Sequence, residues 1–131
     1  MIKKHTISIK NAWHGLKWAL STQPNYRVHL FLSVLAIVGG MYFNISQGEF
    51  LTIFVLITLG FSIETINTAI EETTDAIDTK TRPDIGHAKD VAAGAMLVFA
   101  IGALIISGII FLPHIFQLFS LKFLISNFKL L

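Results

Sequence analysis

The chain has 131 residues, of which 53% are hydrophobic and 14% are charged, and its formal net charge at pH 7 is +2. This composition is too apolar for a water-soluble domain, and the small positive charge does not suggest a nucleic-acid-binding surface. The absence of cysteine excludes disulfide bonds and thiolate metal sites. We therefore expect a single domain, residues 1–131, embedded in a membrane.

The first predicted element is an amphipathic helix over about residues 6–22. Its large apolar residues fall on one side of a helical wheel: Ile9, Trp13, Leu16 and Leu20. The stretch has no uninterrupted apolar core of the kind that a secretory signal contains. We expect this helix to lie in the membrane interface, and an ordinary soluble amphipathic helix is the alternative interpretation.

Three apolar segments follow and predict membrane-spanning helices over 27–46, 49–75 and 89–112. A crossing of the ~30 Å hydrocarbon layer needs about 20 residues, and the middle segment reaches that length only by including Glu64 and Asn67. Polar residues are therefore placed at membrane depth.

Short polar stretches separate these segments. A tight turn joins the first two, and a loop over 76–88 joins the second to the third. Pro113 is expected to end or kink the third helix, and an amphipathic tail over 114–131 follows it. The predicted fold class is an all-α membrane protein with one interfacial helix and three transmembrane helices.

Basic residues are distributed unevenly around the predicted spans. Those that precede the first span or lie between the second and third are Lys3, Lys4, Lys10, Lys17, Arg27, Lys80, Arg82 and Lys89. The turn between the first two spans contains none. By the positive-inside rule, the amino terminus and the loop between the second and third spans face the cytoplasm.

Acidic residues are concentrated in one segment, because seven of the eight lie between Glu64 and Asp90. On a helix, four polar residues fall within an arc of about 80°: Glu64, Asn67, Glu71 and Asp75. Acids at membrane depth normally face a protein interior or a water-filled cavity and mark function. The alternative is a structural role, in which the deeper two bond between helices and the other two extend to the membrane surface.

Carboxylates beside a lysine at the cytoplasmic surface suit a magnesium-bound nucleotide. Mg²⁺ takes oxygen ligands from one or two carboxylates and from phosphates, and lysine supplies a point charge to phosphate. The sequence has no P-loop, dinucleotide-binding or protein-kinase motif, so a nucleotide would bind in another way.

Two sequence blocks carry a resemblance to a known family. They are Glu64-x-x-Asn67-Thr-Ala-Ile-Glu71-x-x-x-Asp75 and Ala88-Lys89-Asp90-x-Ala-Ala-Gly-Ala. Together with Gly15-Leu16-Lys17 and Tyr26-Arg27, they strongly resemble the signature of the prokaryotic diacylglycerol kinase family, which includes the undecaprenol kinases. The resemblance extends over roughly residues 11–112, and the second block looks more like the undecaprenol kinase branch.

The resemblance implies an ATP-dependent kinase that phosphorylates a lipid alcohol, undecaprenol or diacylglycerol, with Mg²⁺ as cofactor. The site would lie at the cytoplasmic surface of the bacterial inner membrane, in a homotrimer with sites shared between neighbours. Glu64 would be the catalytic base, Glu71 would hold the metal, and Asn67 and Asp75 would support the site. Implied ATP-binding residues are Asn11, Gln23, Glu71, Lys80, Arg82, Lys89 and Asp90.

One position departs from the family pattern. Before Tyr26-Arg27 the family usually carries a glutamate that shares the metal with the residue at position 71, whereas this chain has Gln23. An amide oxygen can ligate Mg²⁺ but brings no charge, so Gln23 is a doubtful metal ligand.

Two further expectations concern assembly and the alternative function. Because three helices are not expected to enclose a polar stripe alone, we predict an oligomer. The alternative to a kinase is a non-enzymatic small membrane subunit or a cation-conducting assembly, whose acids would line an ion path.

Overall fold

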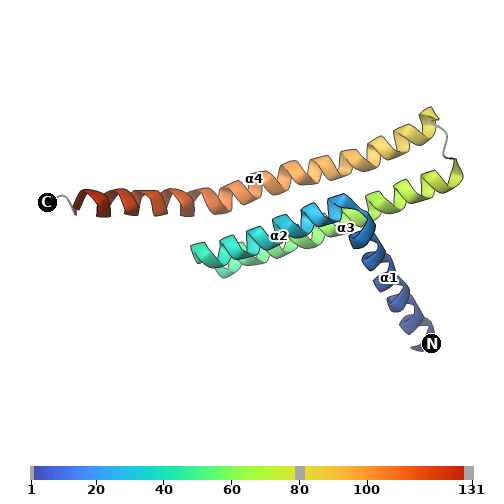
Figure 1. Ribbon diagram of the computed structural model, residues 1–131, viewed down its shortest axis with the longest axis horizontal. Helices are drawn as coiled ribbons and strands as arrows, with labels where there is room; N and C mark the ends of the chain where they lie inside the picture. Colours follow the sequence, from blue (N-terminus) through green and yellow to red (C-terminus); the bar gives the residue numbers. More distant parts are fainter. Residues whose placement is uncertain (1, 79–81, 129–131) are drawn as a thin grey trace.

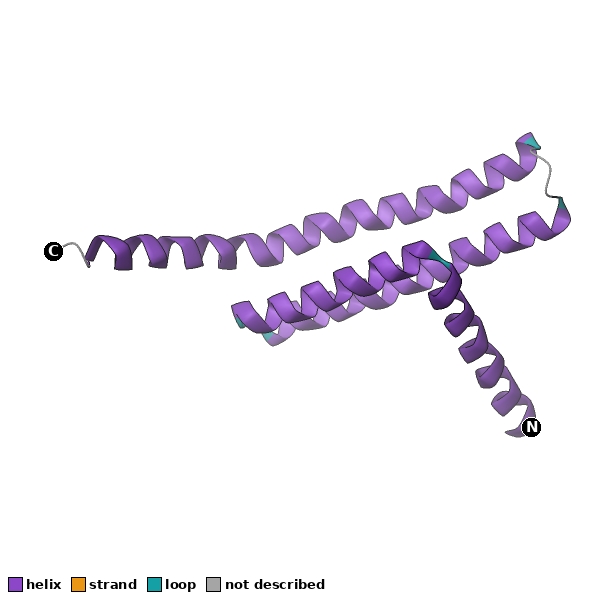
Figure 2. Ribbon diagram, in the orientation of Figure 1, coloured by secondary structure: helices purple, strands orange, loops and turns teal. Residues whose placement is uncertain are grey.

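The computed structural model describes residues 2–78 and 82–128, and the side chains of residues 7–78 and 82–120. This part of the chain forms four helices joined by short loops (Figure 2). They are α1 (Ile2–Thr22), α2 (Pro24–Phe43), α3 (Gln47–Ile77) and α4 (Pro83–Phe128). α2, α3 and α4 are each long and apolar enough to cross a membrane, which confirms the predicted all-α membrane fold with three spans.

α2, α3 and α4 run side by side, and α1 leaves them at a steep angle (Figure 1). α1 keeps its large apolar residues exposed within the described range, with Trp13 59% and Ile9 72% accessible, whereas Ala19 is buried. Pro24 is the first residue of α2, where its missing N–H interrupts no helical bond. At this junction the Gln23 N–H donates to the Ala19 carbonyl over 2.8 Å. The change of direction therefore lies at the Gln23-Pro24 step.

The turn between α2 and α3 is fixed by its own residues. α2 is capped after Phe43 by Asn44, which adopts the left-handed conformation (φ 52°, ψ 48°) that asparagine tolerates better than most residues. α3 then begins with a capping box: the Ser46 hydroxyl accepts from the Glu49 N–H, and the Glu49 carboxylate accepts from the Ser46 N–H. These bonds satisfy backbone donors and fix an antiparallel pair.

The apolar core lies near this turn. Ile45, Ile53 and Ile110 are buried together, and Phe43, Phe50 and Phe111 are among the residues that pack against them. Gly40 is required here because a Cβ atom at this position would come within 2.9 Å of the Ile45 and Phe50 side chains. α3 packs more extensively on α4 than on α2.

Two boundaries differ from those expected from the sequence. α4 begins at Pro83 and continues without a break to Phe128, so Pro113 lies inside a helix and does not end one. The segments 89–112 and 114–131 are therefore parts of the same element within the described residues. The polar connection between α3 and α4 is shorter than the expected 76–88, because α3 extends to Ile77 and α4 already begins at Pro83.

Candidate active site

One inward-facing stripe of α3 changes character along its length. Its positions recur every three or four residues, as contacts between packed helices require. All of them are buried or half-buried: Ile53, Ile57, Gly60, Glu64, Asn67, Glu71 and Thr74. The stripe builds the core near the α2–α3 turn and becomes polar from Glu64 onward. Exposed Asp75 extends its polar part on the same face of the helix.

Glu64 is the deepest polar residue of this stripe. Only 1% of it is exposed, and its Oε2 has no hydrogen-bond partner among the described residues. One turn earlier, a Cβ atom on Gly60 would come within 2.9 Å of the Phe99 ring and 3.5 Å of His29 Nδ1. α2 and α4 therefore both approach the α3 backbone just below Glu64. The expectation that one chain cannot enclose the stripe is wrong for Glu64 and Asn67, which are buried within it.

Asn67 links the buried and the accessible parts of the stripe. It is 5% exposed, and its Nδ2 donates to Glu71 Oε1 over 3.0 Å. Its Oδ1 is buried and has no partner within the described part of the chain. Since the amide occupies one oxygen of the Glu71 carboxylate, it fixes the orientation of that group.

Asp75 and Lys89 join α3 to α4 at the end of the stripe. Lys89 Nζ lies 2.5 Å from Asp75 Oδ1, with side chains 34% and 55% exposed. An ion pair this accessible contributes about 0–1 kcal/mol to stability, so its main effect is to position Lys89 beside the stripe. The two predicted sequence blocks are therefore in contact.

The remaining predicted nucleotide contacts are dispersed. Asn11 lies on the exposed surface of α1, and Asp90 is exposed next to Lys89. Arg82 pairs with Asp84 over 2.6 Å, and these hydrogen bonds raise the pKa of Arg82. Lys80 lies outside the described residues. Half-buried Gln23 precedes α2 and its side chain makes no capping bond there.

Comparison of the sequence with known proteins shows the family to which the chain belongs. The sequence profile of the prokaryotic diacylglycerol kinase family matches residues 10–111. This chain belongs to that family. The matched range includes the whole stripe from Glu64 to Asp75 and the Lys89-Asp90 pair, so the resemblance seen in the sequence is confirmed.

Two proteins that are similar in sequence to this family member are named as kinases. It is 39% identical over 108 residues to the undecaprenol kinase of Bacillus subtilis (strain 168), covering 82% of this chain and 88% of the relative. It is 32% identical over 113 residues to the diacylglycerol kinase of Synechocystis sp. (strain ATCC 27184 / PCC 6803 / Kazusa), covering 86% of this chain and 65% of that protein. The chain is a membrane lipid kinase, and the alternative of a non-enzymatic subunit is not supported.

The carboxylate and amide oxygens of this site suit a metal ion that is already bound to a nucleotide better than a metal ion held by protein ligands alone. Among the described side chains, those of residues 7–78 and 82–120, no group of three or more histidine, aspartate or glutamate residues is arranged to hold a metal. The polar groups of the stripe are carboxylate and amide oxygens, two of them buried without a partner. Mg²⁺ accepts such hard ligands and needs only one or two from the protein when phosphates supply others. The residues therefore fit Mg²⁺ that arrives with a nucleotide.

Sequence reasoning missed a polar contact beside Glu64. Tyr26 is 2% exposed and its hydroxyl bonds to Thr65 Oγ1, which in turn donates to the Phe61 carbonyl over 2.6 Å. Since the threonine hydroxyl has one hydrogen, Tyr26 is the donor in the first bond. The contact joins α2 to α3 at the residue after Glu64. Two residues 39 positions apart gave no local signal of it.

Proposed function

We propose that this kinase transfers the γ-phosphoryl group of ATP to the hydroxyl of a membrane lipid alcohol. The observation that carries the proposal is the alignment of buried Glu64, the Asn67–Glu71 hydrogen bond and the Asp75–Lys89 ion pair along one face of α3. It joins a carboxylate at membrane depth to charged groups at the water-accessible end of the same helix.

Glu64 is proposed as the general base. A carboxylate within hydrogen-bond reach of the attacking hydroxyl can take its proton as the phosphoryl group is transferred. Glu64 has a buried oxygen that is not engaged by the described residues, so this atom remains available to a hydroxyl. Its burial also keeps water, the competing acceptor, away from the reacting group.

The accessible half of the stripe is proposed to bind the nucleotide. Glu71, held by Asn67, would ligate Mg²⁺, and Gln23 is a weaker candidate ligand. Lys89, placed by Asp75, would contact the phosphates, since an ammonium group is a point charge suited to them. Bound Mg²⁺ supplies neutralisation of phosphate charge. Additional nucleotide contacts are proposed for Asn11, Lys80, Arg82 and Asp90.

The orientation of the protein in the membrane is inferred from the distribution of its lysine and arginine residues. We propose a multi-pass protein of the bacterial inner membrane, with the amino terminus and the α3–α4 connection in the cytoplasm. This places the accessible half of the stripe where ATP is found. The lipid would enter laterally, and its hydroxyl would reach Glu64 from the membrane.

The proposed acceptor is undecaprenol, with diacylglycerol as the second candidate. The relative named as an undecaprenol kinase is more similar to this chain than the one named as a diacylglycerol kinase. We further propose a homotrimer, because Glu71 and Asp75 stay accessible in one chain and a neighbour could complete the nucleotide site.

The test is phosphorylation by the purified protein in micelles, with ATP, Mg²⁺ and either undecaprenol or diacylglycerol. We expect product from at least one lipid, and more from undecaprenol. Absence of product with both lipids, from protein that is folded by circular dichroism, would overturn the proposed substrates. Magnesium-dependent thermal stabilisation by a non-hydrolysable ATP analogue tests nucleotide binding separately from lipid choice.

A further inference from the structure

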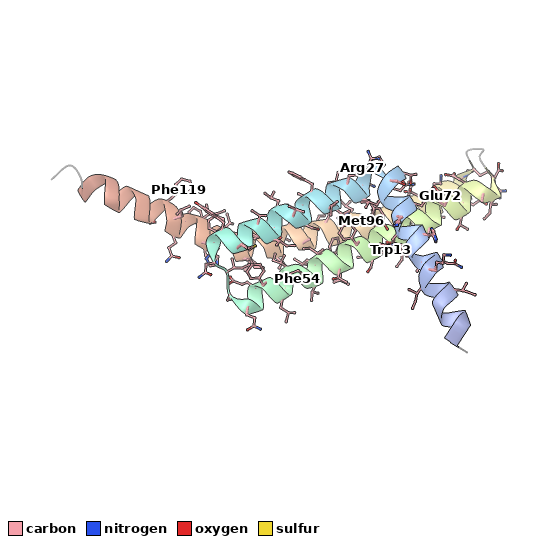
Figure 3. The ribbon with its side chains drawn as sticks, turned by 60° about the horizontal axis from the view of Figure 1, so that its bottom comes forward. Trp13, Arg27, Phe54, Glu72, Met96 and Phe119 are labelled. Atoms are coloured by element: carbon pink, nitrogen blue, oxygen red, sulfur yellow. The ribbon has the colours of Figure 1, made fainter. Side chains whose placement is uncertain are left out.

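The last part of α4 lies outside the region that the kinase family shares. The family profile ends at residue 111, whereas α4 continues to Phe128. This extension, residues 115–128, runs past the α2–α3 turn without a neighbouring helix beside it (Figure 1). Figure 3 shows Phe119 beyond the end of α2. The proposed chemistry, at the opposite end of the bundle, gives the extension no role.

The position of the membrane surface near this extension can be read from α2. α2 has 20 residues, which span about 30 Å and fill the hydrocarbon layer. Polar groups gather where it ends, at Asn44 and in the Ser46–Glu49 capping box. His114 of α4 joins them, with its Nε2 3.2 Å from Glu49 Oε1. The Glu49–His114 contact therefore marks the polar boundary on the face opposite the site.

Beyond this boundary the sequence becomes apolar again. Nine apolar residues are spread around the whole circumference of a helical wheel, with five polar residues (Gln117, Ser120, Lys122, Ser126 and Asn127) between them: Ile115, Phe116, Leu118, Phe119, Leu121, Phe123, Leu124, Ile125 and Phe128. Phe116 and Phe119 are each 65% exposed. A straight helix would carry Phe128 about 21 Å past His114 into water. A helix whose apolar residues lie on every side cannot turn them all away from water unless it packs in protein or in lipid.

Pro113 provides the place where the extension can change direction. Proline has no N–H, so the Ile109 carbonyl loses its helical hydrogen bond, and the ring crowds the preceding turn. Sharp bends in helices occur at such residues. Pro113 directly precedes His114, which places the bend at the polar boundary.

We propose that residues 115–128 bend at Pro113 and lie in the leaflet opposite the active site, covered by lipid acyl chains. Lipid is favoured over a second copy of the chain because a helix–helix contact covers one seam, whereas the apolar residues of this segment are spread around its circumference. The extension also continues the accessible apolar surface of α4, where Leu104 is 75% and Ile109 69% exposed.

Spin labels at single cysteines test this directly, because the chain contains no cysteine. The labelled protein is Phe119→Cys in phosphatidylcholine and phosphatidylglycerol vesicles, with accessibility measured to oxygen and to a water-soluble nickel complex. Leu104→Cys is the hydrocarbon control. Gly48→Cys, at the exposed start of α3, is the surface control. We expect the label at residue 119 to lie about 5–10 Å below the headgroups and to favour oxygen.

Three results would overturn the proposal. Nickel access at residue 119 equal to that at residue 48 would indicate a straight helix, with the label about 7–8 Å into water. Low access to both reagents with spin–spin broadening would indicate packing against a second copy. In the double variant Phe119→Cys/Pro113→Ala, alanine restores the missing N–H, so the label should move toward water. An unchanged depth of the label would show that the helix does not bend at Pro113. None of these readouts depends on kinase activity.

Discussion

The two halves of the polar stripe on α3 differ in environment although they lie on one continuous face. Glu64 and Asn67 are buried within a single chain, whereas Glu71 is half-buried and Asp75 is exposed. The inner half lies just past the contact of Gly60 with Phe99, and the outer half lies beyond the start of α2 (Figure 1). One helix can therefore place a buried carboxylate, Glu64, and solvent-accessible charged groups, Glu71 and Asp75, on the same face.

The largest effect is expected at the inner end, from Glu64→Gln. The amide keeps the size of the side chain but cannot act as a base, so kcat should fall by about 10²–10⁴-fold. Thermal stability in detergent should change little. Glu72→Gln is the matched control, since Glu72 is on the exposed side of the same helix. Equal activity of Glu64→Gln and wild type would show that the two halves do not differ in chemistry.

The link between the halves is tested by Asn67→Ala. The substitution removes the donor that fixes Glu71, and hydrogen bonds to charged groups contribute about 1.5–3 kcal/mol. We expect kcat/KM for ATP to fall by about ten- to a hundredfold, mostly through KM. A change in the lipid KM alone would contradict the proposal that Asn67 acts by holding Glu71 in the nucleotide half. Thr73→Ala, on the exposed surface of α3, is the control.

The packing that closes the inner half is tested by Gly60→Ala. The added Cβ would meet the Phe99 ring at 2.9 Å, and overpacking of this kind costs about 1–3 kcal/mol. The gain in helix propensity offsets at most about 1 kcal/mol of this. Gly48→Ala is the control in α3, because nothing lies within 4 Å of a Cβ there. Unfolding in detergent should show a lower melting temperature for Gly60→Ala only.

The smallest effect on stability is expected at the outer end, from Asp75→Asn. The ion pair with Lys89 is accessible, so its loss should cost less than about 1 kcal/mol. ATP affinity should nevertheless decrease, because Lys89 loses the group that positions it. Isothermal titration with a non-hydrolysable analogue measures this. A large loss of stability without any change in affinity would indicate a structural role for the pair.

The stripe and the spans were predictable because helical periodicity is a local property. The positions of Glu64, Asn67, Glu71 and Asp75 on one face follow from their spacing, and the contact of Asp75 with Lys89 follows from the short connection between the two helices. The family resemblance rested on the same residues and was confirmed. Their individual roles remain proposals.

The features that sequence reasoning missed depend on contacts between distant residues. The burial of Glu64 in one chain requires Gly60 to admit Phe99, and the bond of Tyr26 to Thr65 requires the register of α2 on α3. Pro113 was expected to end or kink the third helix, and the first of these two outcomes is wrong because α4 continues through it.

The unbroken course of α3 has a consequence for substrate choice. Between Glu64 and Asp75 the helix axis advances about 16 Å, and this separation cannot change without breaking backbone hydrogen bonds. The kinase would then select an alcohol by the depth of its hydroxyl oxygen, which must lie at one fixed distance below the headgroups. Chain length and branching of the hydrocarbon would matter less than where the lipid holds its hydroxyl.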